Sequence, residues 1–273
     1  MAEITQQNFG STWTASKLNA VEEYLKAYTT ALRGKFKLRY IDTFAGSGSI
    51  TLKGGKTIDG SAIRALKYPF DGYLFIESDK SHCNTLTEKL AGTVKEKNIT
   101  IINEDCNTFL SKIDTYNWNG YRAIIFIDPY AMDFSWETLV KISNIPVFDV
   151  WYFFPFMAIN RNLYTDLSAM PEANKQQLNR IFGSEDWQTE LYKESPQLTL
   201  FGNVDVEKSN TDEIRTYIVK RFGEIFPTVS PIAPILKNEK KSPQFMLCFM
   251  GSNPNKSAKK LSLRIADYIL SHI

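Results

Sequence analysis

Acidic residues follow several apolar segments of this sequence, and the first of them opens a glycine-rich turn. Residues 40–49 (YIDTFAGSGS) predict a buried strand that ends at Asp42, followed by a turn that contains Gly46 and Gly48. Because glycine has no Cβ, such a turn lets a polar ligand approach the backbone closely. The acid precedes the glycines, which favours a ligand with positive groups over one with phosphates.

The pattern D-x-F-x-G-x-G favours S-adenosylmethionine (AdoMet) over a dinucleotide. A dinucleotide needs its pyrophosphate on a helix N-terminus, whereas AdoMet has no phosphate, and its sulfonium and amino groups favour a nearby carboxylate. We expect Asp42 to bind the amino group directly or through water. The alternative is a plain strand and turn in an unrelated α/β protein. The residues of this segment that we expect to bind the cofactor are Asp42, Phe44, Gly46 and Gly48.

Two more acids follow the next two predicted strands. Glu77 ends the run 73–77 and can accept both hydroxyls of a ribose, as an acid in that place does for NAD. Asp105 follows the run 99–103, where a carboxylate can accept a hydrogen bond from the adenine amino group. Each has a structural alternative, Glu77 as a solvated residue at a strand end and Asp105 as the N-cap of the next helix. An N-cap and a ligand contact differ only in side-chain direction, so both could hold for Asp105.

Asp128, Pro129 and Tyr130 follow the most apolar predicted strand, and we expect them to form a catalytic corner. Proline cannot continue a sheet, so the chain leaves its strand here and Asp128 projects over the cofactor. Methylation of an amine requires a free lone pair. Oxygen acceptors can hold the amine's hydrogens, and the close approach of the nitrogen to the methyl group then promotes the transfer. Tyr130 can stack on a planar substrate, as could the aromatic residues of 153–156 unless they belong to the core. The alternative for residues 128–130 is a loop that only closes a strand.

Apolar strands that alternate with helices must position these acids. Strands are predicted at 38–42, 73–77, 99–103, 122–128 and 148–154, and helices at 14–33, 61–68, 80–90 and 135–143. This pattern predicts a parallel sheet that is covered on both faces and binds ligands beyond the carboxyl ends of its strands. We therefore expect an α/β fold with a Rossmann-like, doubly wound, mainly parallel sheet, a late C-terminal strand at 245–250 and a closing helix at 258–270. Residues 50–60 are expected to form a loop.

The pattern changes after the fifth of these strands. Residues 157–241 are more polar, with helices expected at 171–182 and 211–226. We therefore predict an AdoMet-binding domain of residues 1–156 and 242–273, and a helical insertion of residues 157–241 that covers the site or grips the substrate or a partner. A lysine cluster stands near the end of this insertion, formed by Lys237, Lys240 and Lys241.

Composition narrows the classes of function. The 273 residues carry a net charge of only +2, so binding to nucleic acid would need a local basic patch rather than a global field. The three cysteines form no C-x-x-C and only two histidines accompany them, so we expect neither a disulfide framework nor a metal site. The sequence has no apolar run of 18 residues, and residues 1–13 lack the apolar core of a signal peptide. We therefore expect a cytoplasmic protein that does not enter a membrane.

The ordered motifs resemble class I AdoMet-dependent methyltransferases and, more closely, the three-Cys-motif partner protein family. The resemblance spans most of the chain. Its segments are Trp13, Lys17-Leu18, Tyr24-Leu25, 40–48, Gly60-Ser61-Ala62, Phe75-Ile76-Glu77, Asp105-Cys106-Asn107, 126–130, Phe182-Gly183 before Trp187, and 245–249.

This resemblance implies a seven-stranded sheet that binds AdoMet, and a protein partner, because members are typically encoded near a radical-AdoMet-like protein that bears three cysteines. Amino methyltransferases of adenine or cytosine usually show Asp/Asn-Pro-Pro-Tyr/Phe, whereas residues 128–131 read Asp-Pro-Tyr-Ala. The first hypothesis is an AdoMet-dependent methyltransferase that modifies an exocyclic amine of a nucleic-acid base in a modification or defence system. The alternative is a non-catalytic partner with the methyltransferase fold. An NAD-dependent oxidoreductase is a third hypothesis, which a missing G-x-G-x-x-G disfavours.

Overall fold

The computed structural model describes residues 12–52, 54–198 and 204–273. The signal-peptide prediction concerns residues 1–13, most of which lie outside the described residues. Five parallel strands form most of the central sheet, in the order β7-β6-β1-β4-β5. Their bounds are β1 (Lys37–Asp42), β4 (Gly72–Ile76), β5 (Ile99–Ile102), β6 (Tyr121–Ile127) and β7 (Phe148–Phe154).

The late strand β12 (Pro243–Gly251) enters the sheet antiparallel to β7. Two short strands, β10 (Thr228–Val229) and β11 (Ile235–Lys237), pair with its other side. β10 pairs with the end of β12 and β11 with its first half, so the two share one position in the sheet. The sheet therefore has eight strands rather than the seven that the family resemblance implies, because the nine residues of β12 are long enough for two partners.

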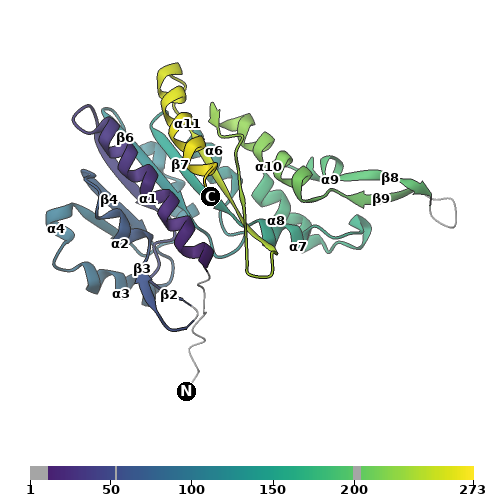
Figure 1. Cartoon of the computed structure of the whole chain (residues 1–273), viewed down its shortest axis with the longest axis horizontal. Coiled ribbons are helices and arrows are strands. Elements are labelled where there is room, and N and C mark those ends of the chain that lie inside the picture. The colour runs from purple at the N-terminus through teal and green to yellow at the C-terminus, as the bar shows by residue number, and fades with distance from the viewer. Residues whose placement is uncertain (1–11, 53, 199–203) are drawn as a thin grey trace.

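Helices cover both faces of the sheet, as the doubly wound prediction requires. Alternate residues of each strand point to opposite faces, so Tyr40 and Phe75 join one buried apolar cluster and Ile41 joins the other. The first face carries α1 and α11, which pack against each other (Figure 1). The helices of the first cluster are α1 (Thr12–Leu32), α2 (Ser61–Ala65), α3 (Lys80–Leu90) and α11 (Lys256–Leu270), with α4 (Val94–Lys97) beside them; those of the second are α5 (Cys106–Leu110), α6 (Trp136–Ser143), α7 (Phe156–Asn162), α8 (Glu172–Phe182), α9 (Trp187–Glu190) and α10 (Thr211–Ile225).

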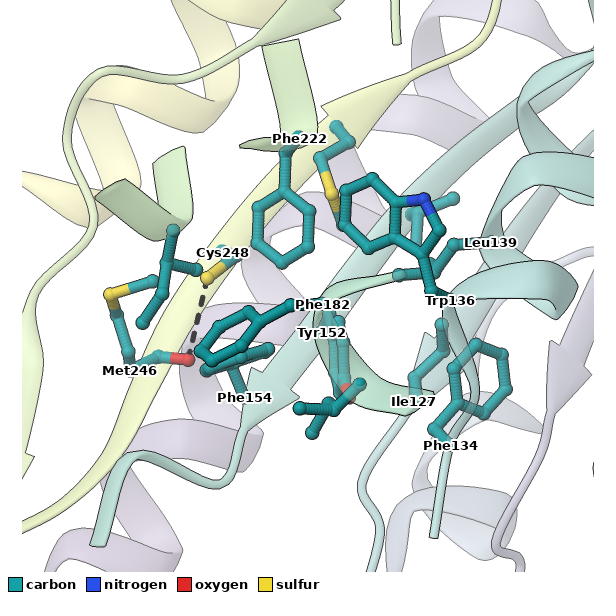
Figure 2. Packing of buried hydrophobic residues seen from close by; sticks show 14 of the residues in the cluster. Ile127, Phe134, Trp136, Leu139, Tyr152, Phe154, Phe182, Phe222, Met246 and Cys248 are labelled. Carbon is teal, nitrogen blue, oxygen red and sulfur yellow. Dashed lines mark hydrogen bonds between the residues drawn. The ribbon is translucent and has the colours of Figure 1, made fainter. Parts of the chain in front are cut away.

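Aromatic side chains dominate the second cluster. Figure 2 shows Phe154, Phe182 and Phe222 packed around Cys248, with Trp136 and Tyr152 beside them. The aromatic residues at the end of β7 belong to these two cores, since Phe153, Phe154 and Phe156 are all buried. They are therefore core residues, the second of the two interpretations of this segment, and do not form an exposed wall for stacking bases.

The fold class is the one that the sequence predicts, and local details differ. Residues 50–60 are not a loop but contain most of a small hairpin of β2 (Ser49–Thr51) and β3 (Thr57–Asp59). Gly54 and Gly55 have φ angles of 95° and 81°, and this left-handed backbone lets the chain reverse tightly. The first helix begins at Thr12, whereas the sequence predicts a helix over 14–33. Within the described residues, no helix combines the length and apolar character needed to cross a membrane.

The segment 157–241 contributes to the main sheet as well as extending from it. Its helices α8 and α10 pack on the second face, and its strands β10 and β11 pair with β12. The hairpin of β8 (Tyr192–Leu198) and β9 (Val204–Lys208) projects away from the body of the molecule (Figure 1). The division into an AdoMet-binding domain and an insertion of residues 157–241 stays a prediction.

Candidate functional site at the carboxyl edge of the sheet

The register of the parallel strands brings three acids to one edge. Asp42 pairs with Phe75 of β4 and with Phe126 of β6, so Glu77 and Asp128 each lie two residues beyond its level. All three follow or end strands that run in the same direction. They therefore lie at the shared carboxyl edge, where open parallel sheets bind their ligands.

The glycine turn closes over Glu77. The Gly46 N–H donates to Glu77 Oε2 at 2.7 Å, and the Asp79 N–H donates to Oε1 at 2.8 Å. Glu77 is only 2% exposed, which excludes the alternative of a solvated residue at a strand end. Each carboxylate oxygen has a second lone pair, so these bonds leave acceptor capacity for ribose hydroxyls.

The two turn glycines have different roles. Both have left-handed backbones, with φ angles of 60° at Gly46 and 76° at Gly48. A Cβ at Gly48 would lie 2.8 Å from a methyl carbon of Leu86 and 3.1 Å from Ile63, so the turn packs tightly on α2 and α3. A Cβ at Gly46 would meet nothing within 4 Å. The space at Gly46 is open to a ligand, whereas the absent side chain at Gly48 serves packing.

Phe44 lies within the same turn, but its ring faces the core. The ring packs edge-on against Phe134, with 6.3 Å between centroids, and it joins the second apolar cluster. A cofactor contact by Phe44 would therefore use its backbone, and this role stays a prediction.

Asp42 is buried, and no cation of the described residues compensates it. Burial, followed by smaller contributions from the charges of Asp128 and Glu77, raises the pKa of Asp42 to about 7. Hydrogen bonds from Ser61 and from the Phe44 N–H lower the pKa without offsetting burial. The ionised carboxylate is therefore disfavoured in the unliganded protein, and a bound cation would favour it.

Asp128 forms an ion pair with Lys17 of α1. The Lys17 Nζ also lies over two rings, 4.9 Å from the centroid of Phe153 and 5.6 Å from that of Phe245. Sequence reasoning assigned Lys17 no role at the site. The signal was present, because Lys17 is four residues before Val21 and seven before Tyr24, which places a lysine on the apolar stripe of the helix.

Pro129 and Tyr130 continue the chain beyond β6. Pro129 is buried, and Tyr130 is 55% exposed. Burial, followed by the charges of Glu77 and Asp128, raises the pKa of Tyr130 to about 12. The phenol therefore keeps its proton and can donate a hydrogen bond, while its ring remains accessible for stacking.

Asp105 is the N-cap of α5. Its carboxylate accepts from the Thr108 N–H at 2.9 Å and from the Thr108 hydroxyl at 3.3 Å. This confirms the structural alternative for Asp105. The residue is exposed at the same edge, and an additional contact with adenine stays a prediction.

The lysine cluster lies at this edge as well. Met246 of β12 pairs with Phe154, the last residue of β7, so the preceding residues of β12 extend past the carboxyl edge. Lys237 pairs with Pro243 there, and the exposed Lys240 and Lys241 lie in the connecting turn. The three lysines, with the acidic Glu239 between them in sequence, therefore lie at the same edge as the acids.

Among the described residues, no group of three or more histidine, cysteine or acidic side chains could hold a metal ion. The edge instead offers buried carboxylates, an open glycine turn and an exposed phenol. These groups fit AdoMet, because its cationic methionine end would compensate Asp42, and its ribose hydroxyls could donate to Glu77.

No protein-family model matches the sequence, and curated proteins give no match. Solved structures are similar to the chain in fold. The structure of protein LPL1258 from Legionella pneumophila superposes with a TM-score of 0.52 at 12% identity, over 95% of this chain and 94% of that one. Trm1 from Pyrococcus horikoshii, solved with AdoMet, gives 0.47 at 12% identity, over 98% and 61% of the two chains. The methyltransferase domain of bacterial CtHen1 gives 0.39 at 14% identity, over 85% and 98%. At 12% identity, the likeness to LPL1258 shows a shared fold and nothing of the chemistry.

Proposed function

We propose that the chain is an AdoMet-dependent methyltransferase that acts on an exocyclic amine of a nucleic-acid base, in a modification or defence system. One observation carries the proposal. The buried Asp42 lies between Glu77 and Asp128 at the carboxyl edge of the sheet, beside an open glycine turn, and it forms no ion pair with any cation of the residues that the structure describes. A ligand that is cationic at one end and carries a ribose would satisfy this edge.

The cofactor end would consist of the turn and two acids. Asp42 would hold the amino group, Glu77 the ribose hydroxyls, and the open position at Gly46 would let the ligand reach the backbone. When bound, AdoMet would supply an electrophilic methyl group on a cationic sulfur.

The acceptor end would be Asp128, Pro129 and Tyr130. Asp128 would accept a hydrogen bond from the substrate amine, which keeps the nitrogen lone pair free and orients it. Tyr130 would stack on the base with its exposed ring. Lys17 would hold the Asp128 carboxylate in place, which makes it a positioning residue. Proximity and orientation of this kind can supply much of the rate enhancement of a transfer reaction.

The lysine cluster supports a nucleic-acid substrate. Lys237, Lys240 and Lys241 stand at the acceptor end of the edge, where they could contact phosphates. Phosphate contacts by lysine supply most of the sequence-independent affinity for nucleic acid. A base stacked on Tyr130 and a backbone held by the lysines would lie on the same side of the molecule.

Two measurements test the proposal. Calorimetry should show binding of AdoMet and of its demethylated product, in preference to NAD and ATP. The protein should also transfer labelled methyl to total RNA or DNA, and Asp128→Asn should lose the transfer while it retains AdoMet binding. Absence of AdoMet binding by the wild type would reject the proposed function.

The ion pair between Lys17 and Asp128 favours a second candidate, a non-catalytic AdoMet-binding partner. Asp128 is only 21% exposed, and its carboxylate already holds a cation where a substrate amine would have to approach. The family resemblance suggests the partner, a three-Cys radical-AdoMet-like protein. In that case AdoMet would bind without transfer to any nucleic acid, and the partner would co-purify with the chain. Transfer activity of the isolated chain would exclude this candidate.

A further inference from the structure

A cavity lies at the opposite edge of the sheet from the glycine turn. It has a volume of about 290 Å³ and lies between α1 and α11. Asp149, near the start of β7, lines it together with Gly251, its partner at the end of β12. The walls are largely apolar, with Leu32, Val147, Leu261 and Ile265 among them. Its size is at the lower end of the range of about 300–1,000 Å³ that small-molecule sites occupy.

One carboxylate lies inside this apolar cavity. The Tyr24 hydroxyl donates to Asp149 Oδ2 at 2.7 Å. Burial raises the pKa of Asp149 to about 6, and the Tyr24 hydrogen bond and Arg122 oppose this rise. A Cβ built on Gly251 would lie 3.3 Å from Asp149 Oδ1 and 3.4 Å from Thr228 Cβ, so both side chains flank this glycine.

Two hydroxyl groups of the cavity lack hydrogen-bond partners within the described part of the chain. The Tyr28 hydroxyl and Thr228 Oγ1 are both buried, in residues that are 4% and 2% exposed. Buried polar groups in native proteins nearly always have a partner, and each exception calls for an explanation. Two such exceptions around one cavity, beside a partly exposed carboxylate, indicate that a polar ligand belongs there.

We propose that this cavity binds a small organic cation that carries a primary ammonium group on a short apolar body. An ammonium has three N–H donors and no acceptor, and in this cavity it would donate to the Asp149 carboxylate and to the Tyr28 and Thr228 hydroxyls. A neutral alcohol could form hydrogen bonds with the hydroxyls but would add no positive charge beside the carboxylate, and an anion would be repelled by it. The apolar walls would bury the body of the ligand.

Arg122 also lines the cavity, but its guanidinium is held by other groups. It stacks over the Phe36 ring at 4.4 Å, and its Nη1 donates to the Tyr121 carbonyl at 2.8 Å. Among the residues that the structure describes, it forms no ion pair with Asp149. The carboxylate therefore remains available to a second cation.

Calorimetry with three probes of similar shape tests the proposal at pH 7.5. Phenethylammonium should bind the wild-type protein, whereas 2-phenylethanol should bind at least about tenfold more weakly and 3-phenylpropanoate should not bind. Asp149→Asn should weaken phenethylammonium binding at least about tenfold. Tyr28→Phe removes only an unpartnered hydroxyl, so it should fold and should weaken binding about three- to tenfold.

Two control variants separate this cavity from the carboxyl edge. Tyr116→Phe makes the same change as Tyr28→Phe on an exposed residue outside the cavity, and should leave binding unchanged. Asp42→Asn removes the buried acid of the cofactor edge and should also leave it unchanged. Failure of phenethylammonium to bind, equal binding of all three probes, or a loss in Asp42→Asn without one in Asp149→Asn would overturn the proposal.

Discussion

Asp42 combines deep burial with a pKa of about 7, well above the usual range of a carboxyl group. A residue that serves only the fold would gain nothing from this arrangement, because the ionised form is disfavoured by its surroundings. Binding sites often retain such groups at a cost in stability, since a ligand of opposite charge recovers the lost free energy.

Asp42→Asn should therefore stabilise the unliganded protein at high pH. Because the folded pKa of about 7 is above the unfolded value, the wild type loses stability as pH rises from about 4 to 7. Asparagine does not ionise, so the variant should be more stable than the wild type at pH 8 by on the order of 1–3 kcal/mol, with the difference vanishing near pH 4. Urea denaturation at several pH values measures this, and AdoMet affinity should be lost.

Asp79→Asn is the matched control, since Asp79 is an exposed N-cap whose pKa is lowered by the His82 N–H. At high pH, Asp79→Asn should be less stable than the wild type, whereas Asp42→Asn should be more stable. A wild type that is as stable at pH 8 as Asp42→Asn would contradict the account of Asp42.

Lys17 should matter more to stability than an exposed lysine does. Lys17→Met leaves the partly buried Asp128 without this cation, and the free energy of unfolding should fall by about 2–4 kcal/mol. Lys67→Met removes an ion pair with Glu22 whose lysine is 55% exposed, and should change stability by about 0–1 kcal/mol. Chemical denaturation of both variants, with Asp128→Asn and the double mutant, gives the coupling energy. Equal effects at the two lysines would show that the Lys17 pair contributes little.

At the scale of elements, the glycine turn joins three parts of the fold. It connects β1 to the small hairpin, its Gly48 packs on α2 and α3, and its Gly46 N–H reaches the acid at the end of β4. A substitution in the turn should therefore affect both the packing on α2 and α3 and the binding of a ligand at the carboxyl edge.

Alanine at the two glycines should have unequal effects. Gly48→Ala meets side chains at 2.8 Å and 3.1 Å and also strains a φ of 76°, so it should lower the free energy of unfolding by about 2–4 kcal/mol. Gly46→Ala meets open space and strains only the backbone, at a cost of about 1 kcal/mol. AdoMet affinity should nevertheless fall in Gly46→Ala, because the new methyl group occupies the space left for the ligand. Thermal unfolding and calorimetry distinguish these effects.

The elements that the sequence predicts best are those with strong periodicity and clear ends. Helix α3 has the predicted bounds, and its N-cap Asp79 accepts a hydrogen bond from the His82 N–H. The strands β8 to β11 were missed, because two- or three-residue strands and a polar hairpin show little alternation. The positions of the acids followed from the strand ends, since parallel strands share their carboxyl edge.

The contacts of those acids could not be predicted in the same way. The ion pair of Lys17 with Asp128 joins residues 111 apart in the chain, and the bond from Gly46 to Glu77 joins residues 31 apart. Sequence spacing reports local periodicity and not which distant side chains meet. A lysine within an apolar stripe was the one local sign that a buried counter-charge had to exist.

At the scale of the whole molecule, the net charge is only +2, but acidic and basic side chains occupy separate parts of the carboxyl edge of the sheet. The carboxylates lie inside, at the ends of β1, β4 and β6, and the lysine cluster lies beside them at the turn between β11 and β12. A polyanion could therefore bind at the lysines while a cationic ligand occupies the interior.

Charge reversal of the lysine cluster should weaken nucleic-acid binding. The triple variant of Lys237, Lys240 and Lys241 to glutamate should bind RNA or DNA at least about tenfold more weakly, with a shallower dependence on salt. The same change at Lys256, Lys259 and Lys260 of α11, which begins at the opposite edge, should have a smaller effect. Fluorescence anisotropy over a range of salt concentrations measures both. Equal losses in the two variants would contradict a nucleic-acid surface at the lysine cluster.

The place of β12 within the sheet has a consequence for how the protein is made. This strand lies between β7 and the pair β10 and β11, yet the ribosome synthesises it after all three. Until β12 has left the ribosome and joined the sheet, β7 has an open edge and the two short strands have no strand to pair with. Unpaired edges of this kind invite association with other chains. The sheet is therefore complete only once β12 has joined it, and each new molecule remains open to misassembly until then.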